Sequence, residues 1–334
     1  MNLQTNYMGL TLKNPIIVGA SGLTSDLESI KELEVNGAAA IVIKSLFQEE
    51  IQLENLKFDE YLNRYNDLHA EMLNHYPNIR HAGAKEHLYW VKQVKQTVDI
   101  PVIASINAID EHTWIDYAKA LEETGVDGLE LNFYNIPKDA QLTGEDIEEK
   151  QVQILKKVKE SVKIPVSVKL SPYYTNITDF LKRLDDAKVD GVVLFNRLFQ
   201  PDIDVENEVE VKSFTLSNES DNRLPLIWTA LLSDQLKTDI SSSTGIMTSE
   251  DVVKMLLTGA ASVQIVSTLY KNKIEYLNTI IKGIENWMKS KNYNSIKSFK
   301  GKLSKKNMKD PWAFERVQYI KMLYSKEEIF EINR

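Results

Sequence analysis

Two sequence patterns that each occur twice decide the fold. Residues 98–106 read VDIPVIASI and residues 162–170 read VKIPVSVKL, each with a proline followed by a short apolar run. Residues 124–132 read TGVDGLELN and residues 187–195 read AKVDGVVLF, and both have a Val-Asp-Gly turn that leads into another apolar run. Short apolar runs bounded by turn residues are typical of buried strands. We therefore expect a unit of two strands and two helices that is present twice.

Further apolar runs and periodic segments extend this unit in both directions. The additional predicted strands are residues 14–20, 38–45, 237–243 and 261–267, which brings the number of expected strands to eight. Helical periodicity occurs in residues 26–37, 112–125, 148–162, 177–188 and 248–259. Strands that alternate with helices form a parallel sheet. Eight such units favour a closed (β/α)₈ TIM barrel, with an open doubly wound sheet as the alternative.

Two long connections and the C-terminal region depart from the alternation. Residues 46–80 and 196–224 are predicted loop insertions over the carboxyl end of the barrel, and residues 208–217 alternate like one arm of a hairpin. The expected domains are a barrel over residues 1–303 and a helical C-terminal extension over residues 304–334 that packs on it.

Composition excludes several classes of protein. The 334 residues carry a formal net charge of −8, which argues against nucleic acid as a partner, since gripping phosphate requires a basic surface. The chain has no cysteine, so it cannot form a disulfide scaffold or hold an iron–sulfur cluster, and no metal site is predicted. No apolar run approaches the roughly 20 residues that span a bilayer, and the start lacks the pattern of a signal peptide. We expect a soluble cytoplasmic protein that binds no membrane.

Polar residues follow the predicted strands at the end where barrel enzymes carry their chemistry. Lys44 and Lys169 each end a β-branched run, where an ammonium group is costly to bury without an anionic partner. A ligand with delocalised negative charge, such as a reduced flavin, would satisfy both lysines. The alternative for each lysine is a side chain that reaches past the rim into water.

Small residues after the last two strands indicate a phosphate site. Ser243, Thr244 and Gly245 follow the seventh strand, and Ser267 and Thr268 follow the eighth. Barrel phosphate sites lie after these two strands, and the spacing fits a mononucleotide. The alternative is a serine-rich loop that only turns the chain and caps a helix.

Together these residues carry a family resemblance that runs from about residue 3 to residue 303. The motifs NPIIVGASG, IVIKS, DGLELN, VSVKLSPY, STGI, GAASVQIVSTL and FKGKL occur in the order found in FMN-dependent dihydroorotate dehydrogenases. The chain resembles their soluble class. The resemblance implies an oxidoreductase of pyrimidine biosynthesis that transfers a hydride from dihydroorotate to N5 of FMN.

The resemblance also implies roles for particular residues. The implied FMN-binding residues are Ala20, Ser21, Gly22, Lys44, Ser45, Asn107, Asn132, Lys169, Ser243, Thr244, Gly245, Ser267 and Thr268. The expected substrate-binding residues are His75, Arg80, His81, Asn132, Asn196 and Arg197, of which Asn196 matches a substrate-binding asparagine of the family.

The chain departs from the family at the catalytic base. Family members carry a Cys or a Ser that removes the substrate proton, whereas Asn135 stands at that position here. An amide cannot take a proton at neutral pH, and general-base catalysis is typically worth ~10²–10⁴ in rate. The predicted catalytic residues are Tyr134, Asn135 and Lys169, with Tyr134, His75 or His81 as the group that moves the proton. For each histidine the alternative is a surface or structural role.

Two other functions remain open at this stage. One is a flavin oxidoreductase for a different small carboxylate, because Arg80 and Arg197 could hold a carboxylate bidentately. The other is a non-catalytic or regulatory barrel that has kept the fold and lost the base. Besides a small-molecule substrate, an electron-transfer partner protein and a homodimer are compatible with the resemblance.

Overall fold

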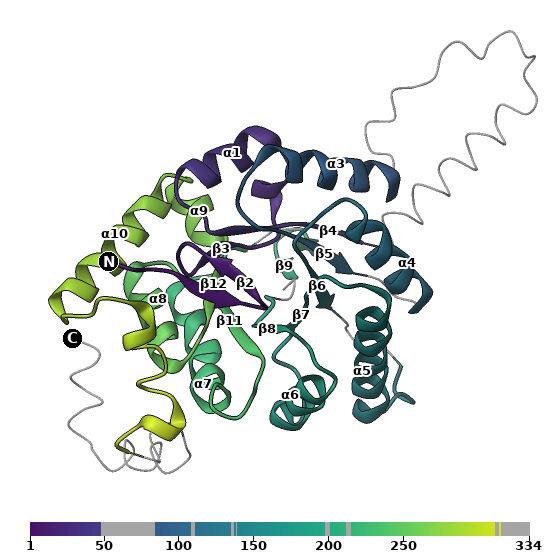
Figure 1. Ribbon diagram of the computed structural model, residues 1–334. Coiled ribbons are helices and arrows are strands. Elements are labelled where there is room, and N and C mark those ends of the chain that lie inside the picture. The colour runs from purple at the N-terminus through teal and green to yellow at the C-terminus, as the bar shows by residue number, and fades with distance from the viewer. Residues whose placement is uncertain are drawn as a thin grey trace, which may run out of the picture.

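In the computed structural model the chain forms a closed parallel barrel (Figure 1), which confirms the predicted (β/α)₈ fold and excludes the open sheet. The structure describes residues 1–47, 84–107, 111–134, 137, 139–197, 201–211, 215–310 and 314. The order of the barrel strands is β11-β12-β3-β4-β5-β6-β7-β8, so neighbours in sequence are neighbours in space. The barrel strands are β3 Ile16–Val18, β4 Ala40–Phe47, β5 Val102–Asn107, β6 Gly128–Phe133, β7 Val166–Leu170, β8 Gly191–Leu194, β11 Asp239–Ser243 and β12 Ser262–Ile265.

The aspartates of the two Val-Asp-Gly turns connect β6 to β5 and β8 to β7 through hydrogen bonds. Asp127, just before β6, accepts a hydrogen bond of 2.7 Å from the backbone N–H of Val102, the first residue of β5. It also pairs with Lys95 at 2.7 Å. Asp190, just before β8, repeats both contacts with the N–H of Val166 and with Lys159. The sequence repeat is therefore also a structural repeat. In each copy, the aspartate of the Val-Asp-Gly turn binds the first residue of the neighbouring strand and a lysine of the helix before that strand.

Helices surround the barrel and bury one face each against its strands (Figure 1). The described helices are α1 Leu27–Val35, α3 Ala84–Thr97, α4 Glu111–Glu122, α5 Gly144–Ser161, α6 Ile177–Asp186, α7 Arg223–Leu232, α8 Ser249–Thr258, α9 Ser267–Asn272 and α10 Tyr276–Ser290. Their apolar stripes meet the outward-facing strand residues in one continuous core. None of the helices within the described ranges is long and apolar enough to cross a membrane.

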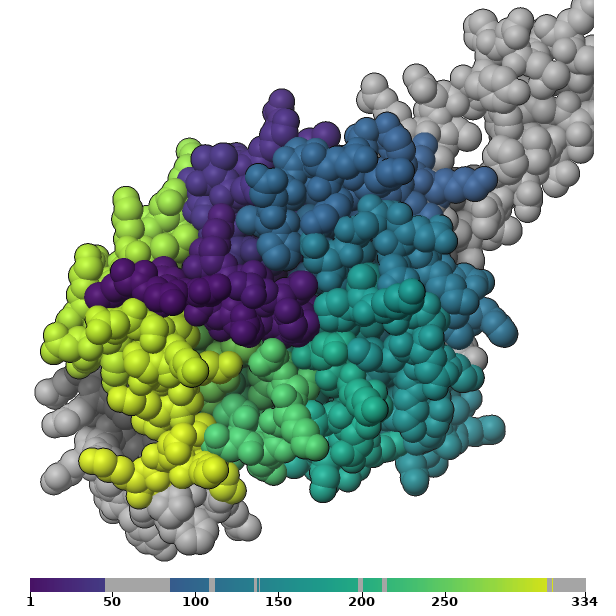
Figure 2. Space-filling view, viewed as in Figure 1, coloured from purple at the N-terminus to yellow at the C-terminus, as the bar shows by residue number. Residues whose placement is uncertain are grey.

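A hairpin covers the amino ends of the barrel strands. Its arms are β1 Thr5–Tyr7 and β2 Leu10–Leu12, which pair antiparallel. The N–H of Met8 donates to Asp239 at the start of β11, and the fully buried Tyr7 packs against Gly191 at the start of β8. Figure 2 shows this N-terminal segment lying across the face of the molecule that the view presents. The hairpin leaves the opposite, carboxyl end of the barrel for a ligand.

The inserted connections are described in part. β9 Asp202–Asp204 and β10 Val209–Val211 form a short antiparallel hairpin, so the hairpin arm expected over residues 208–217 is a strand only at Val209–Val211 among the described residues. Residues 48–83 lie outside the described residues. The C-terminal region contains the short helices η4 Ile296–Ser298 and η5 Lys305–Asn307. Residues 311–313 and 315–334 lie outside the described residues, so a helical extension over residues 304–334 stays a prediction.

Candidate functional site

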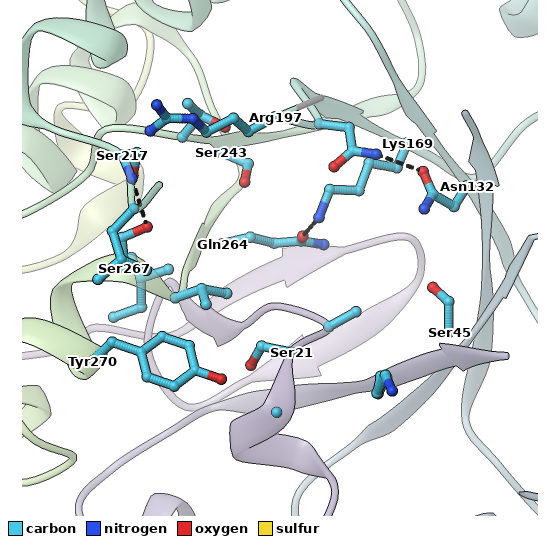
Figure 3. Close-up of a pocket in the computed structure, with 18 of the residues that line it drawn as sticks. Ser21, Ser45, Asn132, Lys169, Arg197, Ser217, Ser243, Gln264, Ser267 and Tyr270 are labelled. Atoms are coloured by element: carbon cyan, nitrogen blue, oxygen red, sulfur yellow. Dashed lines mark hydrogen bonds between the residues drawn. The ribbon is translucent and has the colours of Figure 1, made fainter. Parts of the chain in front are cut away.

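A cavity of about 1070 Å³ opens at the carboxyl ends of the barrel strands (Figure 3). Its walls come from residues in or directly after β3, β4, β6, β7, β8, β11 and β12. Many residues expected from the sequence lie on these walls: Ala20, Ser21, Gly22, Lys44, Ser45, Asn132, Tyr134, Lys169, Asn196, Arg197, Ser243, Thr244, Gly245 and Ser267. The closure of the barrel therefore brings segments that are far apart in sequence into one concave site.

Lys169 takes part in a buried polar network at the base of this cavity. Its Nζ donates to Oε1 of Gln264 at 2.9 Å and lies 3.9 Å from Oε1 of Glu130. The amide nitrogen of Gln264 donates to Oε2 of Glu130 at 2.5 Å. Glu130 is 1% exposed, so it brings a carboxylate into the barrel interior beside a lysine. Pairing with Glu130 and Gln264 explains how the ammonium group is tolerated there.

The second lysine has a different environment. Lys44 lines the same cavity but is exposed, and its backbone N–H donates to the hydroxyl of Thr24 at 3.1 Å. The hydroxyl of the adjacent Ser45 shares a hydrogen bond of 2.6 Å with the hydroxyl of Ser105. The two lysines do converge on one site, one from the interior and one from the rim.

Two asparagine side chains meet beside Lys169 (Figure 3). The Nδ2 of Asn196 donates to Oδ1 of Asn132 at 2.9 Å. This bond leaves Nδ2 of Asn132 as a donor and Oδ1 of Asn196 as an acceptor for a ligand. The neighbouring Arg197 also lines the cavity, and its guanidinium donates to Asp221 at 2.9 Å. Part of the arginine charge is therefore already balanced.

The loops after β11 and β12 approach each other at one end of the cavity. The N–H of Gly245 donates to the hydroxyl of Ser217 at 3.3 Å, and the N–H of Ser217 donates to the hydroxyl of Ser267 at 3.1 Å. Gly245 has a φ of +75°. A Cβ there would lie 2.3 Å from the backbone nitrogen of Asn222, so only glycine fits. The close approach concentrates hydroxyl and backbone N–H groups at this end.

Some expected site residues lie elsewhere. Thr268 is fully buried, and its hydroxyl donates to the carbonyl of Met247 at 2.9 Å instead of lining the cavity. Asn107 is buried at the end of β5 and is not among the cavity-lining residues. His75, Arg80, His81 and Asn135 lie outside the described residues, so their predicted roles remain predictions.

Several residues of the cavity were not expected from the sequence. The most informative are Ser217, Gln264 and Tyr270, and Glu130, a polar residue at a strand end, had no predicted role. Gln264 offered a signal, because a polar residue in the middle of the buried run VQIV has to find a partner inside the barrel. Ser217 and Tyr270 offered none, because a loop serine and a helical tyrosine are common at surfaces. Among the described residues there is also no cluster of His, Asp and Glu that could hold a metal ion.

The fold and the position of the cavity together are typical of a (β/α)₈-barrel enzyme. The carboxyl-end cavity of this (β/α)₈ barrel presents two lysines, paired amides and a hydroxyl-rich loop, and the carboxyl end is where barrel enzymes carry their active sites. The dihydroorotate dehydrogenase family profile matches residues 2–288, and the chain therefore belongs to that family. It is consequently a flavin-dependent oxidoreductase that acts on a CH–CH bond.

Curated relatives match over nearly their whole length. The chain is 27% identical over 302 residues to the catalytic subunit of dihydroorotate dehydrogenase B (NAD(+)) of Methanocaldococcus jannaschii, covering 87% of this chain and 94% of the relative. It is 26% identical over 305 residues to the Thermoplasma acidophilum protein of the same name, covering 90% and 98%. A putative dihydroorotate dehydrogenase A (fumarate) of Aquifex aeolicus is 26% identical over 314 residues, with 90% and 98% covered.

Proposed function

We propose that the chain binds FMN in the carboxyl-end cavity and transfers a hydride between dihydroorotate, or a close cyclic analogue, and the flavin, as a step of pyrimidine biosynthesis. The observation that carries the proposal is the amide pair Asn132–Asn196 beside Lys169 in one cavity. A cyclic amide such as dihydroorotate offers N–H and C=O groups in one plane, which match the donor and acceptor that this pair leaves unused.

The residues present fit FMN. The cavity volume of about 1070 Å³ exceeds what a drug-sized ligand requires, since such pockets measure roughly 300–1,000 Å³. Among the described residues, the buried Oγ of Ser21 has no hydrogen-bond partner. Ser21 lines the cavity. Gly22 packs so closely that a Cβ would lie 2.7 Å from the hydroxyl of Tyr270. An unpaired polar atom and a glycine cradle are what a polar, flat ligand requires.

Each part of the cavity has a proposed role toward FMN. Ala20, Ser21, Gly22, Lys44 and Lys169 would hold the ring system, and Ser217, Ser243, Thr244, Gly245 and Ser267 would hold the phosphate. Bound FMN would supply an atom that accepts the hydride. The two lysines place positive charge where negative charge must be stabilised, which lowers the free energy of the charged state.

The proton of the substrate requires a group on this chain. We assign it to Tyr134, which lines the cavity one residue before Asn135, the position of the family base. A phenol can hold or release a proton, whereas the amide of Asn135 cannot. His75 and His81 are the proposed alternatives for this role.

A second candidate function is oxidation of a different small carboxylate by the same flavin site. The replacement of the base by Asn135 favours it, because a substrate that needs no base at this position would tolerate the amide. The pairing of Arg197 with Asp221 weighs against it, since a carboxylate would have to compete with Asp221 for the guanidinium.

An electron-transfer partner protein is part of the proposal. Several relatives are named as the catalytic subunit of dihydroorotate dehydrogenase B (NAD(+)). A chain of this kind passes its electrons to a further subunit, and this chain has no cysteine with which to hold an iron–sulfur cluster itself.

The proposal is tested by anaerobic titration of the FMN-loaded protein with dihydroorotate while the visible flavin absorbance is recorded. We expect the absorbance to bleach with one dihydroorotate per flavin. Tyr134→Phe should slow bleaching at least about 100-fold, the low end of general-base catalysis. Tyr89→Phe is the matched control, because Tyr89 is 64% exposed on α3.

Other outcomes separate the alternatives. A flavin that binds but stays oxidised with dihydroorotate supports the second candidate function. A protein that takes up no FMN supports the non-catalytic barrel and contradicts the proposal. Unaltered bleaching by Tyr134→Phe removes Tyr134 from the proton step and returns His75 and His81 as candidates.

A further inference from the structure

We propose that Glu130 is a positioning residue of the flavin site: together with Gln264 it holds the Lys169 ammonium and limits how strongly that lysine stabilises negative charge on the bound flavin. The inference rests on the proposed function for its flavin. It assigns a role to a buried carboxylate that neither touches the substrate amides nor takes part in the proton step.

The geometry supports a chain of three side chains from three strands. Glu130 lies on β6, Lys169 on the neighbouring β7 and Gln264 on β12 across the barrel. Gln264 accepts from Lys169 at 2.9 Å through its carbonyl and donates to Glu130 at 2.5 Å through its amide nitrogen. The orientation of the Gln264 amide is therefore set from both sides. Figure 3 shows the Lys169 side chain pointing to Gln264 within the cavity.

Burial strengthens the electrostatic interaction between Glu130 and Lys169. Glu130 is 1% exposed and Lys169 is 8% exposed, so water screens their interaction little. Only one carboxylate oxygen of Glu130 is hydrogen-bonded among the described residues, and the other, Oε1, lies 3.9 Å from Nζ of Lys169. The negative charge of Glu130 is thus directed at the lysine and offsets much of its positive charge.

A consequence follows for any anion that enters the cavity. Glu130 and Gln264 hold the Lys169 ammonium, and the negative charge of Glu130 acts on the ligand together with the positive charge of Lys169, so the ligand experiences less than a full positive charge. Glu130→Gln removes this negative charge, keeps the shape of the side chain and frees the ammonium to turn toward the ligand. The flavin would then accept negative charge more readily.

Glu130→Gln tests this with sulfite, which adds to N5 of oxidised flavin and leaves negative charge on the ring. We expect the sulfite Kd of the FMN-loaded protein to fall at least about tenfold, with a parallel rise in the flavin reduction potential. Glu148→Gln is the control, because Glu148 pairs with Arg183 between the outer helices, away from the cavity. It should leave the sulfite Kd within twofold of the original protein.

A double-mutant cycle distinguishes action through the lysine from direct action on the flavin. In a Lys169→Met background, Glu130→Gln should lower the sulfite Kd by a clearly smaller factor than in the original protein, because no ammonium remains for Glu130 to hold away from the flavin. A sulfite Kd that is unchanged by Glu130→Gln alone, or an equal effect in both backgrounds, overturns the proposal.

The pairing is tested separately on the protein without FMN. Lys169→Met should lower the urea midpoint of unfolding by leaving the Glu130 carboxylate buried and uncompensated, and adding Glu130→Gln should recover most of the loss. Additive shifts overturn the pairing itself. Failure to bind FMN would reject the proposed function, and this unfolding cycle would still decide whether Glu130 holds Lys169.

Discussion

At the scale of single residues, Gly245 shows most clearly why the cavity needs its particular side chains. A left-handed backbone costs about 1–2 kcal/mol for a residue other than glycine, and overpacking typically costs about 1–3 kcal/mol more. Gly245→Ala would bring its Cβ to 2.3 Å from the backbone of Asn222. We expect the free energy of unfolding to fall by about 2–5 kcal/mol, the sum of these costs. Denaturant unfolding measures it.

Gly9→Ala is the matched control for that measurement. Gly9 has a φ of +83°, and a Cβ there meets nothing within 4 Å. It should therefore lose only the conformational cost of about 1–2 kcal/mol. Equal losses in the two variants would contradict the close approach between the loop after β11 and Asn222.

At the scale of elements, the start of α8 connects the candidate phosphate loop to its surroundings. Asp251 accepts from Thr248 and from the N–H of Met247, and it also holds the amide of Asn222 at 2.9 Å. Burial alone raises the pKa of Asp251, but hydrogen bonds from Lys254, Met247 and Thr248 outweigh it and lower the pKa below its usual value. Asp251→Asn should cost about 1–2 kcal/mol, as loss of a helix cap does.

The same variant has a defined pH dependence. Because the folded pKa of Asp251 is lowered, the unfolded chain binds the proton more tightly. The contribution of Asp251 is complete above the unfolded pKa near 3.8 and is lost as the pH falls through the lower folded pKa. Unfolding curves should show the gap between the original protein and Asp251→Asn narrowing in acid. Glu250→Gln, an exposed neighbour in the same turn, should show no such gap.

The barrel strands and the residues at their ends could be predicted from the sequence, whereas contacts between side chains across the barrel could not. Most barrel strands could be predicted because a strand buried on both faces reads as an apolar run between turns, whereas β11, which reads DISSS, followed from its place in the alternation of strands and helices. The polar residues that line the cavity could be predicted because the carboxyl ends of all barrel strands lie at the same end of the barrel. The Glu130–Lys169–Gln264 contact could not, because β12 approaches the neighbouring strands β6 and β7 only when the barrel closes. The partner of the Thr268 hydroxyl was also out of reach, because a hydroxyl after a strand can equally satisfy a nearby carbonyl.

At the scale of the whole molecule, the two ends of the barrel divide stability and function between them. Tyr7 is fully buried in the hairpin at the amino end, far along the strands from the carboxyl-end cavity. Tyr7→Ala should lower the free energy of unfolding by about 3–5 kcal/mol, as loss of a large buried ring does. The FMN Kd of the folded protein should stay within twofold of the original, since barrel sites depend on the other end.

The exposed Tyr89 provides the comparison for this prediction. Tyr89→Ala should change the free energy of unfolding by no more than about 0.5 kcal/mol, as surface substitutions usually do. Unfolding and FMN titrations on the same preparations give both quantities. A large loss of FMN affinity in Tyr7→Ala would contradict the division between the two ends.

We propose above that the carboxyl-end cavity is an FMN site with a phosphate end. The decisive measurement is a titration of the FMN-free protein into FMN and into riboflavin, with flavin fluorescence as the signal. We expect one FMN per chain and at least about tenfold weaker binding of riboflavin, which lacks the phosphate. Equal affinity for the two flavins, or no binding of FMN, would contradict it.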